Sequence, residues 1–278
     1  MIAQSSLSRP IPEAERATFE EDGVVCLRGC FEPEWVSRLQ AAADEVLSGS
    51  GSNLEYTAPG APGRFVLSPF MWRAHPVFRE LVWRSPAAAI AGEITGSNKI
   101  NLFADQLLVK EPGTLDPTLW HHDLPFWPLA GWPVISIWMA LDPVTRATGG
   151  VEYVAGSHRW PVRFRPVPPS TPELARMRNM DLPPCPNFDG RQGEYRILSW
   201  DMEPGDCLVF NALVIHGAAG NSSSTVRRRG FVTRWCGEGV TYLEGDFMQA
   251  LPEPPGIATG DPLDSELFPV VWRRAEPA

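Results

Sequence analysis

The spacing of apolar and polar residues changes near Gly96, and the two parts of the chain predict different elements. Before Gly96, apolar residues recur every three to four positions, as on one face of a helix. Glu32-Pro33 is a typical helix start, and Gly23 is a typical helix end. The predicted helices cover residues 12–23, 32–48, 77–83 and 86–94, with a strand at 24–29 and a Gly/Ser/Pro-rich loop at 48–63.

Beyond Gly96, runs of β-branched and aromatic residues lie between Pro/Gly turns, a pattern that predicts strands. The strands are expected at residues 100–110, around His121, and at 134–141, 149–155, 195–200, 207–216 and 229–236. Helices first and many strands afterwards predict a mainly β protein, a jelly-roll barrel with a helical flank.

No shift in composition or flexible linker divides the chain, so we expect a single domain over residues 1–278. Within it we predict a helical flank at about 13–95, a jelly-roll core at about 98–236 and a C-terminal surface tail at about 238–278. Residues 160–192 are Pro-rich and weakly periodic. A loop of that length in a compact domain is usually a functional lid or a partly disordered segment.

Composition narrows the class of protein. The net charge of −9 disfavours binding to the phosphates of nucleic acid. No window of about 18 apolar residues exists, and the first residues lack the pattern of a secretion signal, so no membrane partner is expected. The five cysteines have no paired short spacings, which favours reduced thiols and a cytoplasmic protein. The sequence does not indicate an oligomeric state.

The stretch WHHDLPFWP, residues 120–128, holds two adjacent histidines and an acid. Side chains alternate between the faces of a strand, so His121 and Asp123 are expected on one face and His122 on the other. An imidazole and a carboxylate on one face can bind a single metal ion. A hydrogen-bonded buried pair without a metal is the alternative for these two residues alone.

A third ligand would come from another strand. His216 ends the long apolar run 207–216 and is placed to face the mouth of a barrel. Two histidines and one carboxylate on one face of a metal ion leave three coordination positions open, as in non-haem Fe(II) oxygenases. Zinc enzymes also combine histidine and carboxylate ligands, so these three residues alone do not identify the metal. Arg227 follows eleven residues after His216 and could clamp a carboxylate in bidentate fashion. Arg229 shares its face and is the second choice, whereas Arg228 points to the opposite face.

Several motifs occur in the order and spacing of a known family. The pattern H-x-D-x-x-Y-x-P is matched by His121, Asp123, Phe126 and Pro128, and G-D-x-x-x-F…H…N…R by Gly205, Asp206, Phe210, His216, Asn221 and Arg227. The stretch GGVEYVAGSHR is similar to the family segment G-x-L-x-x-x-P-G-S-H. Over about residues 18–236, the sequence resembles the phytanoyl-CoA dioxygenase (PhyH) family of Fe(II)/2-oxoglutarate-dependent oxygenases.

This resemblance implies a double-stranded β-helix, the cupin-like form of the jelly roll, that uses Fe(II), 2-oxoglutarate and O2. The implied iron ligands are His121, Asp123 and His216, and the implied cosubstrate residues are Arg227, Trp138, Gln106 and Lys110. Arg227 would hold the distal carboxylate of 2-oxoglutarate. Phe126 departs from the motif tyrosine, and Ala218 stands where relatives often carry a serine.

The expected reaction is hydroxylation of a small, partly apolar metabolite with release of succinate and CO2; desaturation, epoxidation and ring closure stay open. Phe126 and Trp127 follow the metal motif and are expected to line the substrate pocket. Arg163 and Arg165 are expected to meet an anionic group on the substrate. Two other classes remain: a zinc hydrolase or isomerase on a cupin-like barrel, and a non-catalytic 2-oxoglutarate-binding protein.

Overall fold

The computed structural model describes residues 10–49, 54–55, 62–167 and 175–275. The helices in these ranges are α1 (Glu13–Asp22), α2 (Pro33–Ser48), α3 (Met71–Ala74), α4 (Pro76–Arg84), α5 (Ala87–Thr95) and the 3-10 turns η1 (Leu124–Phe126), η2 (Arg146–Thr148) and η3 (Ser157–Arg159). The strands are β1 (Val24–Leu27), β2 (Leu54–Glu55), β3 (Phe65–Pro69), β4 (Lys99–Lys110), β5 (Thr118–His121), β6 (Leu129–Gly131), β7 (Val134–Ala140), β8 (Val151–Val154), β9 (Ile197–Leu198), β10 (Cys207–Asn211), β11 (His216–Ala218), β12 (Arg228–Gly237), β13 (Val240–Tyr242) and β14 (Val270–Arg273).

The predicted helices of the N-terminal flank are confirmed. α1 ends at Gly23, whose φ of 78° is the left-handed conformation that glycine adopts without strain. α2 begins with Pro33, which lacks the backbone N–H that would be unpaired in the first turn. None of the helices in the described ranges has both the length and the apolar character needed to cross a membrane.

Two antiparallel sheets form the barrel, and the predicted fold class is confirmed. The major sheet has the strand order β1-β10-β7-β12-β4-β3-β2, with β14 also paired to β4, and the minor sheet has the order β5-β11-β8-β9. A short pair, β13-β6, extends the structure beside them. From β4 onward the chain passes repeatedly between the two sheets, as β4, β7, β10 and β12 lie in the major sheet and β5, β8 and β11 in the minor sheet, which is typical of a jelly roll.

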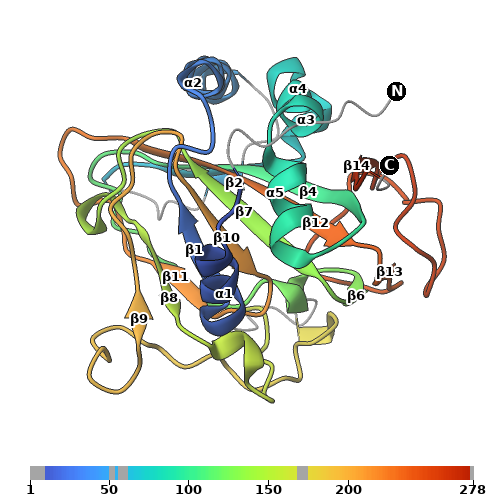
Figure 1. The fold of residues 1–278 in the computed structure, drawn as a ribbon. Coiled ribbons are helices and arrows are strands. Elements are labelled where there is room, and N and C mark those ends of the chain that lie inside the picture. The colour runs from blue at the N-terminus through green and yellow to red at the C-terminus, as the bar shows by residue number, and fades with distance from the viewer. Residues whose placement is uncertain (1–9, 50–53, 56–61, 168–174, 276–278) are drawn as a thin grey trace.

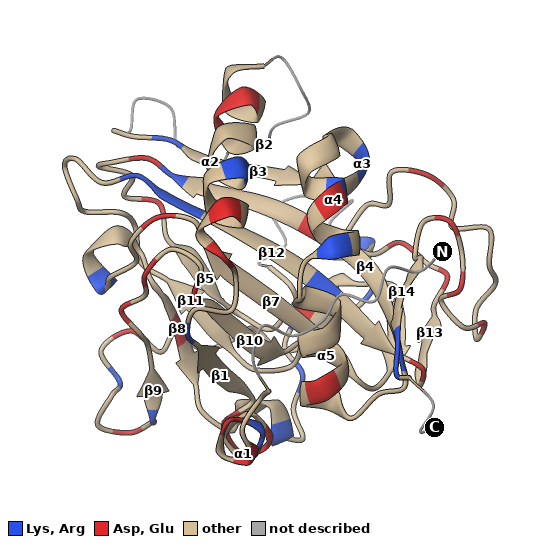
Figure 2. Cartoon of the chain, turned by 45° about the horizontal axis from the view of Figure 1, so that its top comes forward, with Lys and Arg blue, Asp and Glu red and all other residues tan. Residues whose placement is uncertain are grey.

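The major sheet separates two apolar cores. On one face, residues such as Ile135, Ile137 and Met139 of β7 pack against the helices, which lie over this face in Figure 1. On the other face, Trp138 and Ala140 pack with Tyr153 inside the barrel. Figure 2 shows charged residues mainly on helices, turns and strand ends, with the middle of the major sheet mostly uncharged. A charged side chain inside the barrel is therefore notable.

The predicted strand 207–216 is two strands in different sheets. β10 ends at Asn211, whose Oδ1 accepts a hydrogen bond from Leu213 N, and Val214 N donates to Asn211 O. This local turn interrupts an otherwise continuous apolar run. It carries the chain from the major sheet to the minor sheet, where β11 begins with His216.

The sequence predicts a surface tail over residues 238–278, but this part of the chain contributes to the sheets and the core. β14 pairs with β4, and the Phe268 and Val271 side chains are fully buried. The described parts of the predicted loop 160–192 cover the outer face of the minor sheet, where Phe164 and Phe188 pack with Val154 of β8 and with Ile215, which directly precedes β11. Residues 168–174 of that loop lie outside the described ranges.

Candidate metal centre

Two of the predicted ligands lie side by side in the minor sheet. β5 and β11 pair so that His121 is directly opposite His216, with 4.3 Å between ring centroids. β11 also pairs with β8, which places the Tyr153 ring against the other side of His216. The row of three rings on the inner face follows from strand alternation. His122 points away and its Nε2 accepts a hydrogen bond from Phe164 N.

Asp123 completes the group from the 3-10 turn that follows β5. Its Oδ1 lies 3.6 Å from His121 Nε2 and 3.9 Å from His216 Nε2, and its Oδ2 accepts a hydrogen bond from Ser136 Oγ at 3.2 Å. One ligand atom from each of the three residues lies within 4.8 Å of the others, a cluster that could hold a metal ion.

Hydrogen bonds and charge hold the three side chains in the state that binds a metal. His121 Nδ1 lies 2.7 Å from Leu119 O and His216 Nδ1 lies 3.0 Å from Val214 O. A carbonyl only accepts, so each Nδ1 donates and each Nε2 keeps its lone pair toward the cluster. Burial, with the neighbouring His121, lowers the pKa of His216 to about 4. Burial would raise the pKa of Asp123, but the nearby His121, His216 and Arg234 outweigh it and hold that pKa below its usual range.

Two buried basic side chains face each other on the inner side of the major sheet. Arg228 of β12 is directly opposite Lys110 of β4, and the two residues are 2% and 0% exposed. Lys110 Nζ donates to Ala219 O at 2.7 Å, whereas Arg228 Nε has no hydrogen-bond partner within the described part of the chain. Burial, and then the charge of Arg228, lower the pKa of Lys110 to about 6. Such a pair is suited to receive an anion.

The structure corrects the choice of arginine. Arg227 lies outside the barrel, where its Nη1 donates to Asp44 Oδ1 at 2.7 Å and its Nε to Glu111 Oε2 at 2.8 Å. Arg229, the second choice, forms a bidentate pair with Asp142 on the same side. The alternation of the three arginines was predicted correctly, but the inward face belongs to Arg228. Counting from His216 did not fix the face, since residues 219–227 belong to no strand and a slip of one residue inverts it.

Trp138 and Lys110, two of the residues expected at the cosubstrate, lie beside Arg228. The Arg228 Cζ lies 5.6 Å from the centroid of the Trp138 ring. The indole packs on Gly230, where an added Cβ would lie 2.0 Å from the ring. A glycine at this position therefore lets the tryptophan lie flat against β12. Gln106 is further along β4, and its Oε1 accepts a hydrogen bond from Arg234 Nη2.

Of the predicted substrate residues, the structure brings Phe126 to the triad. Its ring meets His121 edge-on, with 5.5 Å between centroids. Trp127 is buried in a separate core with Phe103, and its ring also faces Arg234.

The two other predicted substrate residues lie on the Pro-rich loop. Arg163 Nη1 donates to Trp160 O at 2.7 Å, and its charge acts on the outward-pointing His122 rather than on the triad. Arg165 lies on the same segment, and its backbone N donates to Pro183 O. Neither arginine has a described contact with His121, Asp123 or His216.

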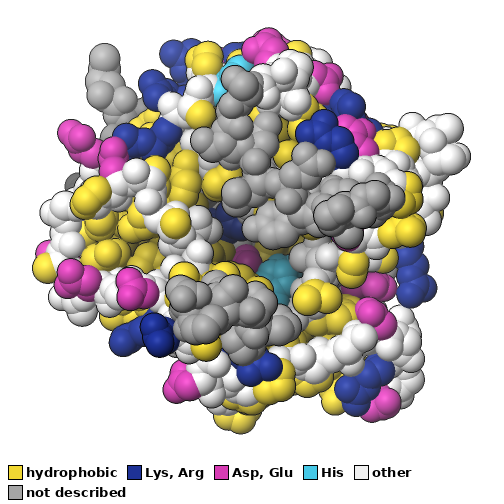
Figure 3. All heavy atoms as spheres, turned by 180° about the vertical axis from the view of Figure 1, so that it is seen from behind, with side chains coloured by type: hydrophobic (Ala, Val, Ile, Leu, Met, Phe, Trp, Pro, Cys, Tyr) yellow, Lys and Arg dark blue, Asp and Glu magenta, His cyan; other side chains and the backbone are white. Residues whose placement is uncertain are grey.

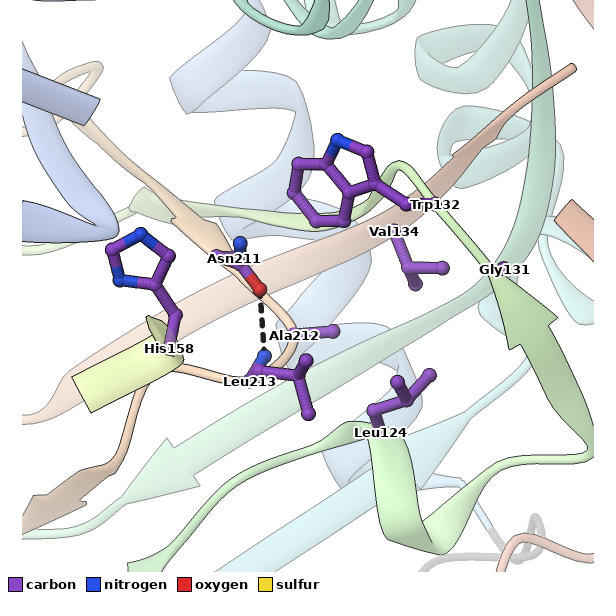
Figure 4. A pocket seen from close by; sticks show the side chains of 8 residues that line it. All are labelled: Leu124, Gly131, Trp132, Val134, His158, Asn211, Ala212 and Leu213. Atoms are coloured by element: carbon purple, nitrogen blue, oxygen red, sulfur yellow. Dashed lines mark hydrogen bonds between the residues drawn. The ribbon is translucent and has the colours of Figure 1, made fainter. Parts of the chain in front are cut away.

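A hollow of about 230 Å3 lies next to the triad without including it. Figure 4 shows its walls, which come from η1, η3, the segment leading into β7 and the turn between β10 and β11: Leu124, Gly131, Trp132, Val134, His158, Asn211, Ala212 and Leu213. Leu124, one of these lining residues, directly follows Asp123 in the chain. On the face shown in Figure 3, a depression exposes histidine and acidic side chains among hydrophobic ones.

The donor set fits iron with a dicarboxylate cosubstrate. Two imidazoles and one carboxylate converge and leave the remaining coordination positions open. Arg228 supplies buried positive charge on the facing sheet, and Lys110 supplies a buried amine opposite it. The Tyr153 hydroxyl is also buried and has no hydrogen-bond partner in the described ranges. Sequence reasoning missed Arg228, Ser136 and Tyr153. Strand alternation would have found Ser136 and Tyr153 once the inward face was fixed by Trp138 and His216.

Comparisons with known proteins agree with this geometry. The family model for phytanoyl-CoA dioxygenase (PhyH) matches residues 19–230, which include the triad and Arg228. The multifunctional dioxygenase prhA of Penicillium brasilianum is 28% identical over 236 residues, which are 77% of this chain and 68% of that protein. The non-heme alpha ketoglutarate dependent carbocyclase SnoK from nogalamycin biosynthesis superposes with a TM-score of 0.75 at 25% identity, over 97% of this chain and 100% of SnoK. The non-heme alpha ketoglutarate dependent epimerase SnoN from the same biosynthesis also superposes with a TM-score of 0.75, at 22% identity, over 96% of this chain and 98% of SnoN.

Proposed function

The chain belongs to the phytanoyl-CoA dioxygenase (PhyH) family of Fe(II)/2-oxoglutarate-dependent dioxygenases, and we propose that it hydroxylates a small, partly apolar organic molecule. The observation that carries the proposal is that one barrel holds the His121/Asp123/His216 cluster on one sheet and the buried Arg228 and Lys110 on the other. The first group suits the metal. The second suits the far carboxylate of 2-oxoglutarate.

In this proposal each residue has a defined task. His121 and His216 present Nε2, and Asp123 presents Oδ1, with Ser136 holding the other carboxylate oxygen. Arg228 binds the distal carboxylate of 2-oxoglutarate, and Lys110 adds a second donor opposite it. Trp138, packed on Gly230, forms an apolar wall that keeps water from that ion pair.

When bound, Fe(II) with 2-oxoglutarate and O2 supplies the oxidation that converts R–H to R–OH, with 2-oxoglutarate ending as succinate and CO2. Phe126 replaces the hydroxyl of the family tyrosine with an apolar ring edge beside His121. This ring supports an apolar part of the substrate next to the metal. The chain's remaining contribution is a dry, shaped site.

Ring closure is the second candidate reaction. It is favoured by the likeness to SnoK, whose name describes a carbocyclase, over nearly the whole chain. The two reactions differ in mass balance, because hydroxylation adds one oxygen atom to the substrate whereas ring closure removes two hydrogen atoms.

The test is an untargeted mass-spectrometric comparison of a metabolite extract incubated with the wild type or with His216→Ala, under 18O2 and with 2-oxoglutarate. We expect a species that gains one 18O atom and forms only with the wild type. A species that loses two hydrogens would replace hydroxylation by ring closure or desaturation. Turnover that needs zinc but neither 2-oxoglutarate nor O2 would contradict the proposal.

A cytoplasmic location is part of the same proposal. It is supported by the odd number of cysteines in the sequence, all five of them free thiols in the structure.

A further inference from the structure

Arg234 is a second arginine on the inward face of β12, and the proposed mechanism does not use it. It is 8% exposed and lies six residues after Arg228, on the same side of the strand. Its register partner on β7 is Ser136, the residue that donates to Asp123. Asp123 is also the charge that acts on Arg234 most strongly. The guanidinium therefore lies on the metal side of the barrel.

The described residues hold Arg234 in place but do not neutralise it. Its Nη2 donates to Gln106 Oε1 at 3.0 Å, and its Cζ lies 5.2 Å from the centroid of the Trp127 ring. Its Nε is buried without a hydrogen-bond partner. No carboxylate oxygen of the described chain lies within 4.0 Å of it, in contrast to Arg229, whose guanidinium binds both oxygens of Asp142.

A buried guanidinium without a carboxylate is costly unless a ligand supplies one. Asp123 forms no ion pair with Arg234 within 4.0 Å, and once a metal is bound the charge of Asp123 is shared with the ion. The two positive charges of Fe(II) are balanced by Asp123 and the metal-bound carboxylate of 2-oxoglutarate. Arg228 balances the far carboxylate. Asp105 also acts on Arg234, but it accepts a hydrogen bond from Trp72 N on the helix side of the sheet, and burial raises its pKa to about 8. The charge of Arg234 is therefore left without a partner on the metal side of the barrel.

We propose that Arg234, oriented by Gln106 and Trp127, binds an anionic oxygen of the substrate, so that the substrate is a small organic acid. This inference rests on the proposed function. The carboxylate would be held at Arg234, and the apolar part of the molecule would reach Phe126 and the metal. A fixed carboxylate selects which C–H bond faces the iron, so Arg234 sets both specificity and position of attack.

The test compares a series of aryl and cycloalkyl carboxylic acids with the corresponding primary amides. Each probe is titrated calorimetrically into the protein loaded with Fe(II) and 2-oxoglutarate without oxygen. We expect at least one acid to bind tenfold or more tightly than its amide. Arg234→Gln should abolish this preference and Arg234→Lys should keep part of it. Arg84→Gln, the same change at a 69% exposed arginine remote from the site, should keep all of it.

The visible absorption of the Fe(II)–2-oxoglutarate complex is recorded in each sample before the titration. Its presence in Arg234→Gln shows that the variant is folded and binds the cosubstrate. If the wild type binds no acid in preference to its amide, Arg234 serves only as a counter-ion for Asp123, and the inference is overturned. If the absorption itself is missing in the wild type, the proposed function fails first.

Discussion

Arg228→Gln removes the buried charge opposite Lys110 while keeping a side chain of similar length. If Arg228 binds the distal carboxylate of 2-oxoglutarate, the variant leaves that carboxylate in a buried site without its main partner. Breaking a buried charge pair in this way costs about 3–5 kcal/mol. Lys110 remains as a second donor, so we take the lower end, about 3 kcal/mol, which corresponds to a roughly 100-fold increase in Kd.

Arg227→Gln is the matched control, since it makes the same chemical change one residue away. Arg227 is paired outside the barrel with Asp44 and Glu111, and its side chain is 38% exposed. Exposed pairs of this kind contribute about 0.2–1 kcal/mol each. The control should therefore lower the free energy of unfolding by about 1 kcal/mol and leave the Kd of 2-oxoglutarate within about twofold.

The assay is anaerobic calorimetric titration of the Fe(II)-loaded variants with 2-oxoglutarate, together with urea unfolding without the cosubstrate. Arg228→Gln should not lose stability, because it removes a buried cation whose Nε has no hydrogen-bond partner in the described part of the chain. A Kd for Arg228→Gln within about threefold of the wild type would refute the assignment. So would a larger loss of affinity in Arg227→Gln than in Arg228→Gln.

Further predictions concern the residues around this pair. Gly230→Ala forces a Cβ to 2.0 Å from the Trp138 indole, so thermal unfolding should show a loss of about 1–3 kcal/mol and 2-oxoglutarate should bind more weakly; unchanged values of both would contradict the packing. Burial lowers the pKa of Lys110 from 10.5 to about 6, so between these values the unfolded chain binds a proton that the folded chain does not, and the free energy of unfolding should rise with pH, by at most about 1.4 kcal/mol per pH unit. Lys110→Met should remove that rise. In urea unfolding, the free energy of unfolding of Lys110→Met should therefore exceed that of the wild type by more at about pH 6 than at about pH 8.5. An equal difference at both pH values would show that Lys110 does not cause the rise. Arg163→Ala should leave substrate affinity unchanged, because Arg163 binds Trp160 O beside the outward-pointing His122; a raised KM would restore its predicted role at the substrate.

Much of the metal cluster could be predicted from local sequence, although strand alternation explains only part of its geometry. β5 ends at His121, and Asp123 follows in a helical conformation at the start of η1. His121 and Asp123 are two residues apart and share a face, whereas His122 between them points outward to Phe164. His216 is confirmed as their neighbour because β11 pairs directly with β5. The prediction of one strand over residues 207–216 was wrong. The chain turns at Asn211, where the side-chain oxygen accepts a hydrogen bond from Leu213 N, and the apolar residues on both sides of Asn211 give no sign of this turn.

The inward arginine could not be predicted in the same way. Its face depends on where β12 begins, and this is fixed by pairing with Lys110 on β4, a contact between residues far apart in the chain. The burial of the C-terminal segment has the same origin. β14 pairs with β4, which is far from it in the sequence. The segment from Glu238 to β14 is rich in proline, glycine and acidic residues, so its composition predicted a surface tail. Arg234 follows by alternation once Arg228 is known to point inward.

We propose that one barrel binds iron through His121, Asp123 and His216 and binds 2-oxoglutarate through Arg228. The most direct test is an anaerobic titration of the metal-free protein with Fe(II) and then 2-oxoglutarate, followed by the visible metal-to-ligand charge-transfer band. We predict a band in the wild type that is absent in His216→Ala, weaker at equal cosubstrate concentration in Arg228→Gln, and unchanged in Arg227→Gln. Iron bound without a band would mean that 2-oxoglutarate does not chelate this metal, and the account of the site would be wrong.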